Sequence, residues 1–153
     1  MQVHSAAQMQ QLGHRIARIA QGSDVLILTG ELGAGKTTLA QGIAQGLGIT
    51  EPVTSPTFVL SKQYRNPRED GLNLVHLDVY RIASVDELLD LWSEAEAQHA
   101  LTLVEWGAPW SREFGNSVAE LVLSIGENDA RVVEVAANSR SGGDFAQRIA
   151  SVL

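Results

Sequence analysis

The stretch that decides the fold covers residues 24–37 and reads Asp-Val-Leu-Ile-Leu-Thr followed by Gly30-Glu31-Leu32-Gly33-Ala34-Gly35-Lys36-Thr37. Its apolar first part is typical of a strand that is buried on both faces of a sheet. Residues 36–47 carry leucine and isoleucine on one stripe, which predicts a helix directly after the glycines. A glycine-rich loop between a strand and a helix, with Lys-Thr at its end, fits the spacing G-x-x-x-x-G-K-[ST] and indicates a phosphate-binding loop.

The residue types in this loop predict its ligand. Glycines at positions 30, 33 and 35 allow backbone amides to face inward, and the following helix adds the positive end of its dipole. Lys36 can reach the terminal phosphates, the Thr37 hydroxyl can ligate magnesium, and Thr38 can bond near the α-phosphate. We therefore expect a nucleoside triphosphate with Mg²⁺, bound by Gly33, Ala34, Gly35, Lys36, Thr37 and Thr38. The alternative is a plain glycine turn with a solvated lysine.

The rest of the chain alternates between helical and strand patterns. Helices are predicted at 5–21, 36–47, after a capping box at 84–87, and at 144–152. Strands are predicted at 57–64, 72–78 and 101–104, besides 24–29, and a hairpin is predicted from 118–125 and 131–136. This order predicts an α/β fold, the three-layer sandwich of P-loop nucleoside triphosphatases with a mixed parallel and antiparallel sheet. We expect one domain over residues 1–153.

Composition excludes several classes of partner. The net charge of −7 argues against strong binding of nucleic acid by the chain alone. Arginines 65, 68 and 81 lie among carboxylates at 69, 70 and 78, which favours a mixed solvated surface over a basic patch. No window is long and apolar enough for a membrane span. With no cysteine and no secretion signal, we expect a cytoplasmic protein.

Hydrolysis also requires acidic groups, and two predicted strands end in one. Strand 72–77 leads into Asp78, and strand 101–104 leads into Glu105. Carboxyl ends of parallel strands meet at one edge of a sheet, where α/β proteins bind their ligands. Glu105 is therefore a candidate for the magnesium shell, and Asp78 or Glu105 a candidate to orient water. The alternatives are an ordinary strand-end carboxylate and, for Asp78, a structural hydrogen bond to backbone or Arg81.

Three further side chains have two interpretations each. Thr57 follows a proline-stiffened loop and is either a sensor of the γ-phosphate or a strand-entry threonine. Trp106 directly follows Glu105, so it is either core or a residue that flanks the nucleotide or a partner. His76 shares a strand face with Asp78, but no third ligand supports a transition-metal site.

Four motifs in this order resemble the TsaE (YjeE) family, the small bacterial ATPases of tRNA threonylcarbamoyladenosine synthesis. They are the loop at 30–38, Ser55-Pro56-Thr57-Phe58, His76-Leu77-Asp78-Val79-Tyr80-Arg81 and Val104-Glu105-Trp106, within a likeness over about residues 5–136. The resemblance implies slow ATP hydrolysis that resets an assembly with the partners TsaD and TsaB. It also implies that Lys36 and Thr37 bind phosphate and magnesium, that Thr57 belongs to a switch-like loop, and that Asp78, Glu105 and Trp106 are needed for activity.

This chain departs from the family at Gly107, where proline is common after the tryptophan. Two other functions use the same loop. A small-molecule kinase needs an acceptor pocket and an arginine-rich lid, and residues 64–81 contain three arginines. A nucleotide-gated binding module needs no hydrolysis at all. The chain has no Asn-Lys-x-Asp guanine motif, so ATP is favoured over GTP. No arginine finger is evident from sequence, which predicts slow intrinsic turnover.

Overall fold

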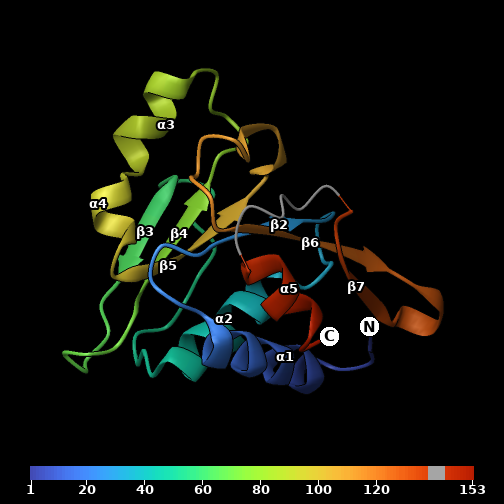
Figure 1. The fold of residues 1–153 in the computed structure, drawn as a ribbon. Coiled ribbons are helices and arrows are strands. Elements are labelled where there is room, and N and C mark those ends of the chain that lie inside the picture. The colour runs from blue at the N-terminus through green and yellow to red at the C-terminus, as the bar shows by residue number, and fades with distance from the viewer. Residues whose placement is uncertain (138–143) are drawn as a thin grey trace.

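The computed structural model describes residues 1–137 and 144–153, and its centre is a seven-stranded sheet in the order β1-β7-β6-β2-β5-β4-β3 (Figure 1). The strands are β1 (Gln2–Val3), β2 (Val25–Thr29), β3 (Ser61–Tyr64), β4 (Asn73–Asp78), β5 (Ala100–Glu105), β6 (Val118–Ile125) and β7 (Arg131–Val135). The middle pairs β6–β2, β2–β5 and β5–β4 are parallel, whereas β1–β7, β6–β7 and β3–β4 are antiparallel. The predicted mixed sheet is confirmed.

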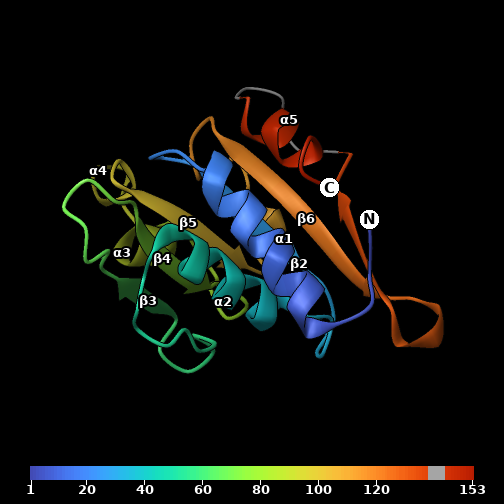
Figure 2. The same cartoon turned by 90° about the horizontal axis from the view of Figure 1, so that it is seen from below.

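Helices cover both faces of this sheet, as Figures 1 and 2 show. They are α1 (Ala6–Ile19), α2 (Lys36–Leu47), α3 (Val85–Leu91), α4 (Glu94–Ala97) and α5 (Phe145–Ala150). Strand β2 shows the layering, because Leu26 and Leu28 join the core cluster that includes α1, α2 and α5, whereas Val25 and Ile27 join the cluster that includes α3 and α4. The α/β fold with three layers is confirmed.

Close packing of α1 against α2 fixes the helix that follows the glycine-rich loop. A Cβ added at Gly13 would lie 2.6 Å from the backbone of Gly42, and one added at Gly42 would lie 2.5 Å from the carbonyl oxygen of Gln10. The absence of side chains at both positions lets the helices touch. Gly48 ends α2 as its C-cap in the left-handed region at φ 88°, which glycine adopts without a Cβ penalty.

The predicted strand 57–64 is wrong in its first half. Strand β3 begins only at Ser61, and residues 57–60 form a turn. The carbonyl oxygen of Pro56 accepts hydrogen bonds from the amides of both Val59 and Leu60, at 3.0 and 2.7 Å. Leu60 has a φ of 63°, which no strand residue adopts. Local hydrogen bonds thus prevail over the β propensity of Thr-Phe-Val-Leu.

Other boundaries differ by a few residues. Helix α1 begins after its N-cap Ser5, whose hydroxyl accepts from the amide of Gln8 at 3.2 Å. The last helix is shorter than predicted, and β5 is longer. Strand β1 and helix α4 escaped sequence reasoning because each is too short to show a period. Among the described residues, no helix is both long and apolar enough to cross a membrane.

A buried charge ties α5 to the rest of the molecule. Asp24 is 1% exposed and accepts from Arg148 on α5, the amide of Gln21 and the hydroxyl of Ser117. Burial alone lowers the pKa of Arg148, but the hydrogen bonds and charges of Asp24 and Asp144 outweigh it and raise that pKa. The contacts with Asp24 and Asp144 therefore favour the charged form of the guanidinium.

Arg148→Ala should lower the free energy of unfolding by about 2 kcal/mol, because it leaves a buried carboxylate with two backbone or hydroxyl donors but no countercharge. Urea unfolding followed by circular dichroism measures this. Arg68→Ala is the matched control, since the Arg68–Asp70 pair is 68% and 79% exposed and should leave the midpoint unchanged. Equal midpoints for both variants would show that the Asp24 contact contributes nothing.

Candidate functional site

A cavity of about 680 Å³ lies over the carboxyl ends of β2, β4 and β5, beside the glycine-rich loop. Its size falls within the range of ligand pockets. The residues that line it come from four separate segments: Leu32, Gly33, Gly35, Lys36, Thr37, Thr38, Ser55, Thr57, Asp78, Tyr80, Arg81, Glu105 and Trp106. Every predicted site residue lines this cavity except Ala34, which is buried in the core behind the loop.

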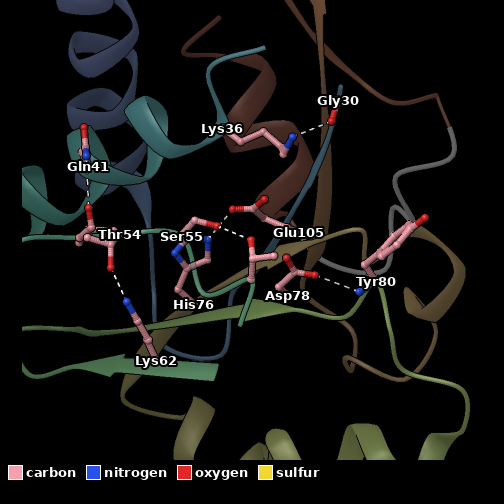
Figure 3. A network of polar contacts seen from close by, with 12 residues as sticks. Gly30, Lys36, Gln41, Thr54, Ser55, Lys62, His76, Asp78, Tyr80 and Glu105 are labelled. Carbon is pink, nitrogen blue, oxygen red and sulfur yellow. Dashed lines mark hydrogen bonds and ion pairs between the residues drawn. The ribbon is translucent and has the colours of Figure 1, made fainter. Parts of the chain in front are cut away.

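The loop itself is held in a shape that glycine permits. Gly33 and Gly35 have φ values of 82° and 106°, in the left-handed region, immediately before α2 begins. The Lys36 ammonium donates to the carbonyl oxygens of Gly30 at 2.6 Å and Glu31 at 3.1 Å (Figure 3). Lys36 is only 9% exposed, so its charge is held over the loop instead of in bulk water.

The sheet register brings the two predicted acids together. Glu105 pairs with Leu28 on one side and with Asp78 on the other, so Glu105 stands next to the strand that leads into the loop and Asp78 lies one strand further along the sheet. Asp78 and Glu105 are 4% and 5% exposed. The Oδ1 atom of Asp78 accepts from the amide of Tyr80 at 3.0 Å, which is the structural hydrogen bond weighed for this residue. Figure 3 shows Glu105 between Lys36 and His76.

Thr57 enters the cavity from the turn that replaces the predicted strand start. Its hydroxyl lies 2.8 Å from that of Ser55, and both residues line the cavity. The strand-entry alternative for Thr57 is therefore wrong, because β3 begins four residues later. Two hydroxyls on one loop can contact a ligand that the loop at 30–37 holds.

Trp106 lies at the rim and is 41% exposed, so it is not a core residue. Its ring centroid is 5.6 Å from the Lys36 ammonium and 5.1 Å from the ring of Tyr80. Its φ of 63° is a left-handed conformation that costs a non-glycine residue about 1–3 kcal/mol. Trp92 is buried in the core cluster that includes α3 and α4, and Trp110 is partly buried against that cluster.

Sequence reasoning missed four residues of the cavity as site residues: Leu32, Ser55, Tyr80 and Arg81. All four lie within three residues of a predicted site residue in the chain, and that proximity was the available signal. Arg81 is exposed and makes no ion pair or hydrogen bond with the described residues. Arg65 and Arg68 lie outside the cavity, and Arg68 pairs with Asp70 at 3.3 Å.

His76 contacts an acid of the neighbouring strand. Its Nε2 atom lies 3.0 Å from Oε1 of Glu105, in a fully buried position on β4. Within residues 1–137 and 144–153, no group of three or more histidine, aspartate or glutamate side chains is placed to hold a metal ion. Oxygen ligands for a hard cation are nonetheless present, because the Thr37 hydroxyl and the Glu105 carboxylate line the same cavity. The residues thus fit a magnesium nucleotide.

Fold and site together define an α/β protein with a glycine-rich strand–loop–helix unit and strand-end acids around one cavity. The family model "Threonylcarbamoyl adenosine biosynthesis protein TsaE" matches residues 3–133. The chain therefore belongs to the TsaE family, and the resemblance seen in its motifs is confirmed.

Individual relatives agree with this membership. The protein named tRNA threonylcarbamoyladenosine biosynthesis protein TsaE from Streptomyces coelicolor is 44% identical over 100 residues, which are 65% of this chain and 67% of the relative. The proteins of the same name from Bacillus subtilis and Treponema pallidum are 41% and 34% identical, over 76% and 86% of this chain and 72% and 96% of theirs. The crystal structure of Bacillus subtilis YdiB superposes with a TM-score of 0.75 at 30% identity, over 99% of this chain and 90% of that one.

Gly30→Ala should destabilise the protein more than Gly33→Ala. A Cβ at position 30 would lie 2.4 Å from the backbone oxygen of Leu123, so β6 must move, which costs about 2 kcal/mol. A Cβ at position 33 meets nothing within 4 Å, and only its left-handed φ costs about 1 kcal/mol. Urea unfolding of both variants measures the order. The reverse order would show that the loop is not packed tightly against β6.

Proposed function

We propose that this chain binds ATP with Mg²⁺ and hydrolyses it slowly, as a component of the machinery that makes threonylcarbamoyladenosine in tRNA. The observation that carries the proposal is a single cavity that collects Lys36, Thr37, Asp78 and Glu105. Membership in a family described by this biosynthesis supports the pathway. The cavity supports the chemistry, because it joins a phosphate-binding type of loop to two buried acids.

Each group around the cavity has a role that follows from its position. Backbone amides of the loop and the Lys36 ammonium bind the phosphates, which draws Lys36 away from the carbonyls of Gly30 and Glu31. Thr37 and Glu105 hold the magnesium ion, which neutralises charge on the phosphates when bound. Oδ1 of Asp78 accepts from the amide of Tyr80, and Oδ2 is left for a water molecule.

Two residues at the rim complete the assignment. Thr57 detects the terminal phosphate from its turn, since its hydroxyl and that of Ser55 line the cavity opposite the loop. Trp106 places an aromatic face near the Lys36 ammonium and shields it from water. Both residues sit on backbone segments outside the regular strands, which can shift when the nucleotide changes.

The family resemblance supports TsaD and TsaB as partners and ATP turnover as the step that resets their assembly. An acidic chain with a net charge of −7 reaches tRNA through partners and not by its own surface. We accordingly propose that it acts where tRNA is modified, in the cytoplasm. Of the three arginines considered for a kinase lid, only Arg81 lines the cavity, so hydrolysis is favoured over phosphoryl transfer to a metabolite.

Lys36→Ala should abolish measurable ATP binding, and Glu105→Ala should bind ATP but lose at least about 10²-fold in turnover. The reason is that Lys36 meets the phosphates themselves, whereas Glu105 acts on the metal. Calorimetry measures the first effect and phosphate release the second, each with and without partner proteins and tRNA. Glu134→Ala, which changes an exposed carboxylate on β7, is the control and should behave as wild type.

Three outcomes would contradict the proposal. Wild-type turnover in Glu105→Ala removes Glu105 from the mechanism. Tight ATP binding without hydrolysis, even when partners are present, favours the nucleotide-gated module. Transfer of phosphate to a metabolite faster than to water favours the kinase.

Arg81→Ala should lower turnover by about 10²-fold while ATP affinity changes little. An unpaired guanidinium at the cavity is placed to neutralise the charge that develops on the transferred phosphate. Arg65→Ala is the matched control, because Arg65 is exposed and lies outside the cavity. Steady-state phosphate release compares the two, and equal rates would assign Arg81 to the surface instead of the reaction.

A further inference from the structure

The imidazole of His76 is buried against the carboxylate of Glu105. His76 is 0% exposed, and its Nε2 atom lies 3.0 Å from Oε1 of Glu105. Its other ring nitrogen, Nδ1, is buried without any hydrogen-bond partner among the described residues. We propose that His76 is a positioning residue that fixes the Glu105 carboxylate in the orientation needed for magnesium, a role that rests on the proposed function.

The sheet determines which way this pair faces. On β4 and β5, His76 pairs with Leu103 and Asp78 pairs with Glu105, so all four side chains project to the same face. Leu103 belongs to the core cluster of α1 and α2, whereas Leu77 and Val104 belong to the opposite cluster. The His76–Glu105 pair therefore lies on the side of the sheet that α2 and the glycine-rich loop cover (Figure 3).

The contacts decide which nitrogen carries the proton. A neutral ring with hydrogen on Nε2 donates to Glu105 and leaves only a lone pair unpartnered at Nδ1. The opposite tautomer would bury an N–H group at Nδ1 with no acceptor and turn a lone pair toward a carboxylate. The structure thus assigns a donor role to Nε2 and an acceptor role to Oε1.

This hydrogen bond gives the two carboxylate oxygens of Glu105 different roles. Oε1 of Glu105 is committed to His76, and Oε2 accepts no hydrogen bond from the described residues and is left for the cavity that Glu105 lines. Hydrogen bonds behind a metal-binding group orient it and are worth about 10- to 100-fold in metal affinity or activity. An apolar residue at position 76 would match Leu74 and Leu103 in the core on the same face but could not hold the carboxylate.

Glutamine and asparagine at position 76 separate orientation from packing. The amide nitrogen of glutamine reaches about as far as Nε2 of histidine, whereas that of asparagine reaches only as far as Nδ1. His76→Gln should keep the donor to Glu105, and His76→Asn should lose it. The magnesium concentration that half-saturates binding of a non-hydrolysable ATP analogue, measured by calorimetry, should rise about tenfold in His76→Asn and stay near wild type in His76→Gln.

Turnover should follow the same order. At subsaturating magnesium, kcat falls in His76→Asn and recovers in His76→Gln, while the KM for ATP at saturating magnesium stays unchanged in both. Circular dichroism establishes that both variants are folded. Equal behaviour of the two variants, whether both wild type or both impaired, overturns the positioning role.

Nitrogen NMR of histidine-labelled protein without nucleotide gives a readout that does not depend on activity. Wild-type protein should show hydrogen on Nε2 of His76 and none on Nδ1, and the Nε2–H signal should move in Glu105→Ala. A proton on Nδ1 overturns the proposal even in an active enzyme. Wild-type protein that binds no nucleotide overturns the proposed function and this role together, whereas normal wild-type turnover with identical His76 variants overturns this role alone.

Discussion

The parallel pairing of β2, β5 and β4 is the constraint on which the site depends. Parallel strands end on the same side, so the end of β2 that opens into the glycine-rich loop must lie beside the ends of β5 and β4. The register places Glu105 next to both Leu28 and Asp78. Two acids far apart in sequence thereby line one cavity, because their strands are neighbours in the sheet.

The parallel pairing also explains which parts of the site could be predicted from the sequence. The loop, α2 and the strands that end in Asp78 and Glu105 each have a sequence pattern of their own. Once a parallel sheet is assumed, these segments meet at one edge of it. The contact between His76 and Glu105 carries no such signal. In the sequence, His76 shares a strand face with Asp78. The acid that it contacts lies on the neighbouring strand, and only the sheet register reveals that contact.

The segment around Thr57 shows a different limit. Its residues favour a strand, yet the carbonyl of Pro56 accepts two backbone hydrogen bonds and bends the chain before β3 begins. Hydrogen bonds of this kind depend on where the preceding proline places its carbonyl, which composition does not report. The same turn places Thr57 in the cavity wall beside Ser55, and not at the start of a strand.

Charges of both signs around the cavity bear on which ligand it accepts. Lys36 and Arg81 bring two positive charges to the lining, and Asp78 and Glu105 bring two negative ones. Nucleotide phosphates, with about four negative charges, would meet buried carboxylates that repel them unless a cation lies between. The loop amides and the α2 dipole favour the anion, while the acids oppose it, so only an anion that arrives with a divalent cation satisfies both sets of groups. In the proposed function, the carboxylates would therefore select the metal-bound form of the nucleotide before any bond is broken.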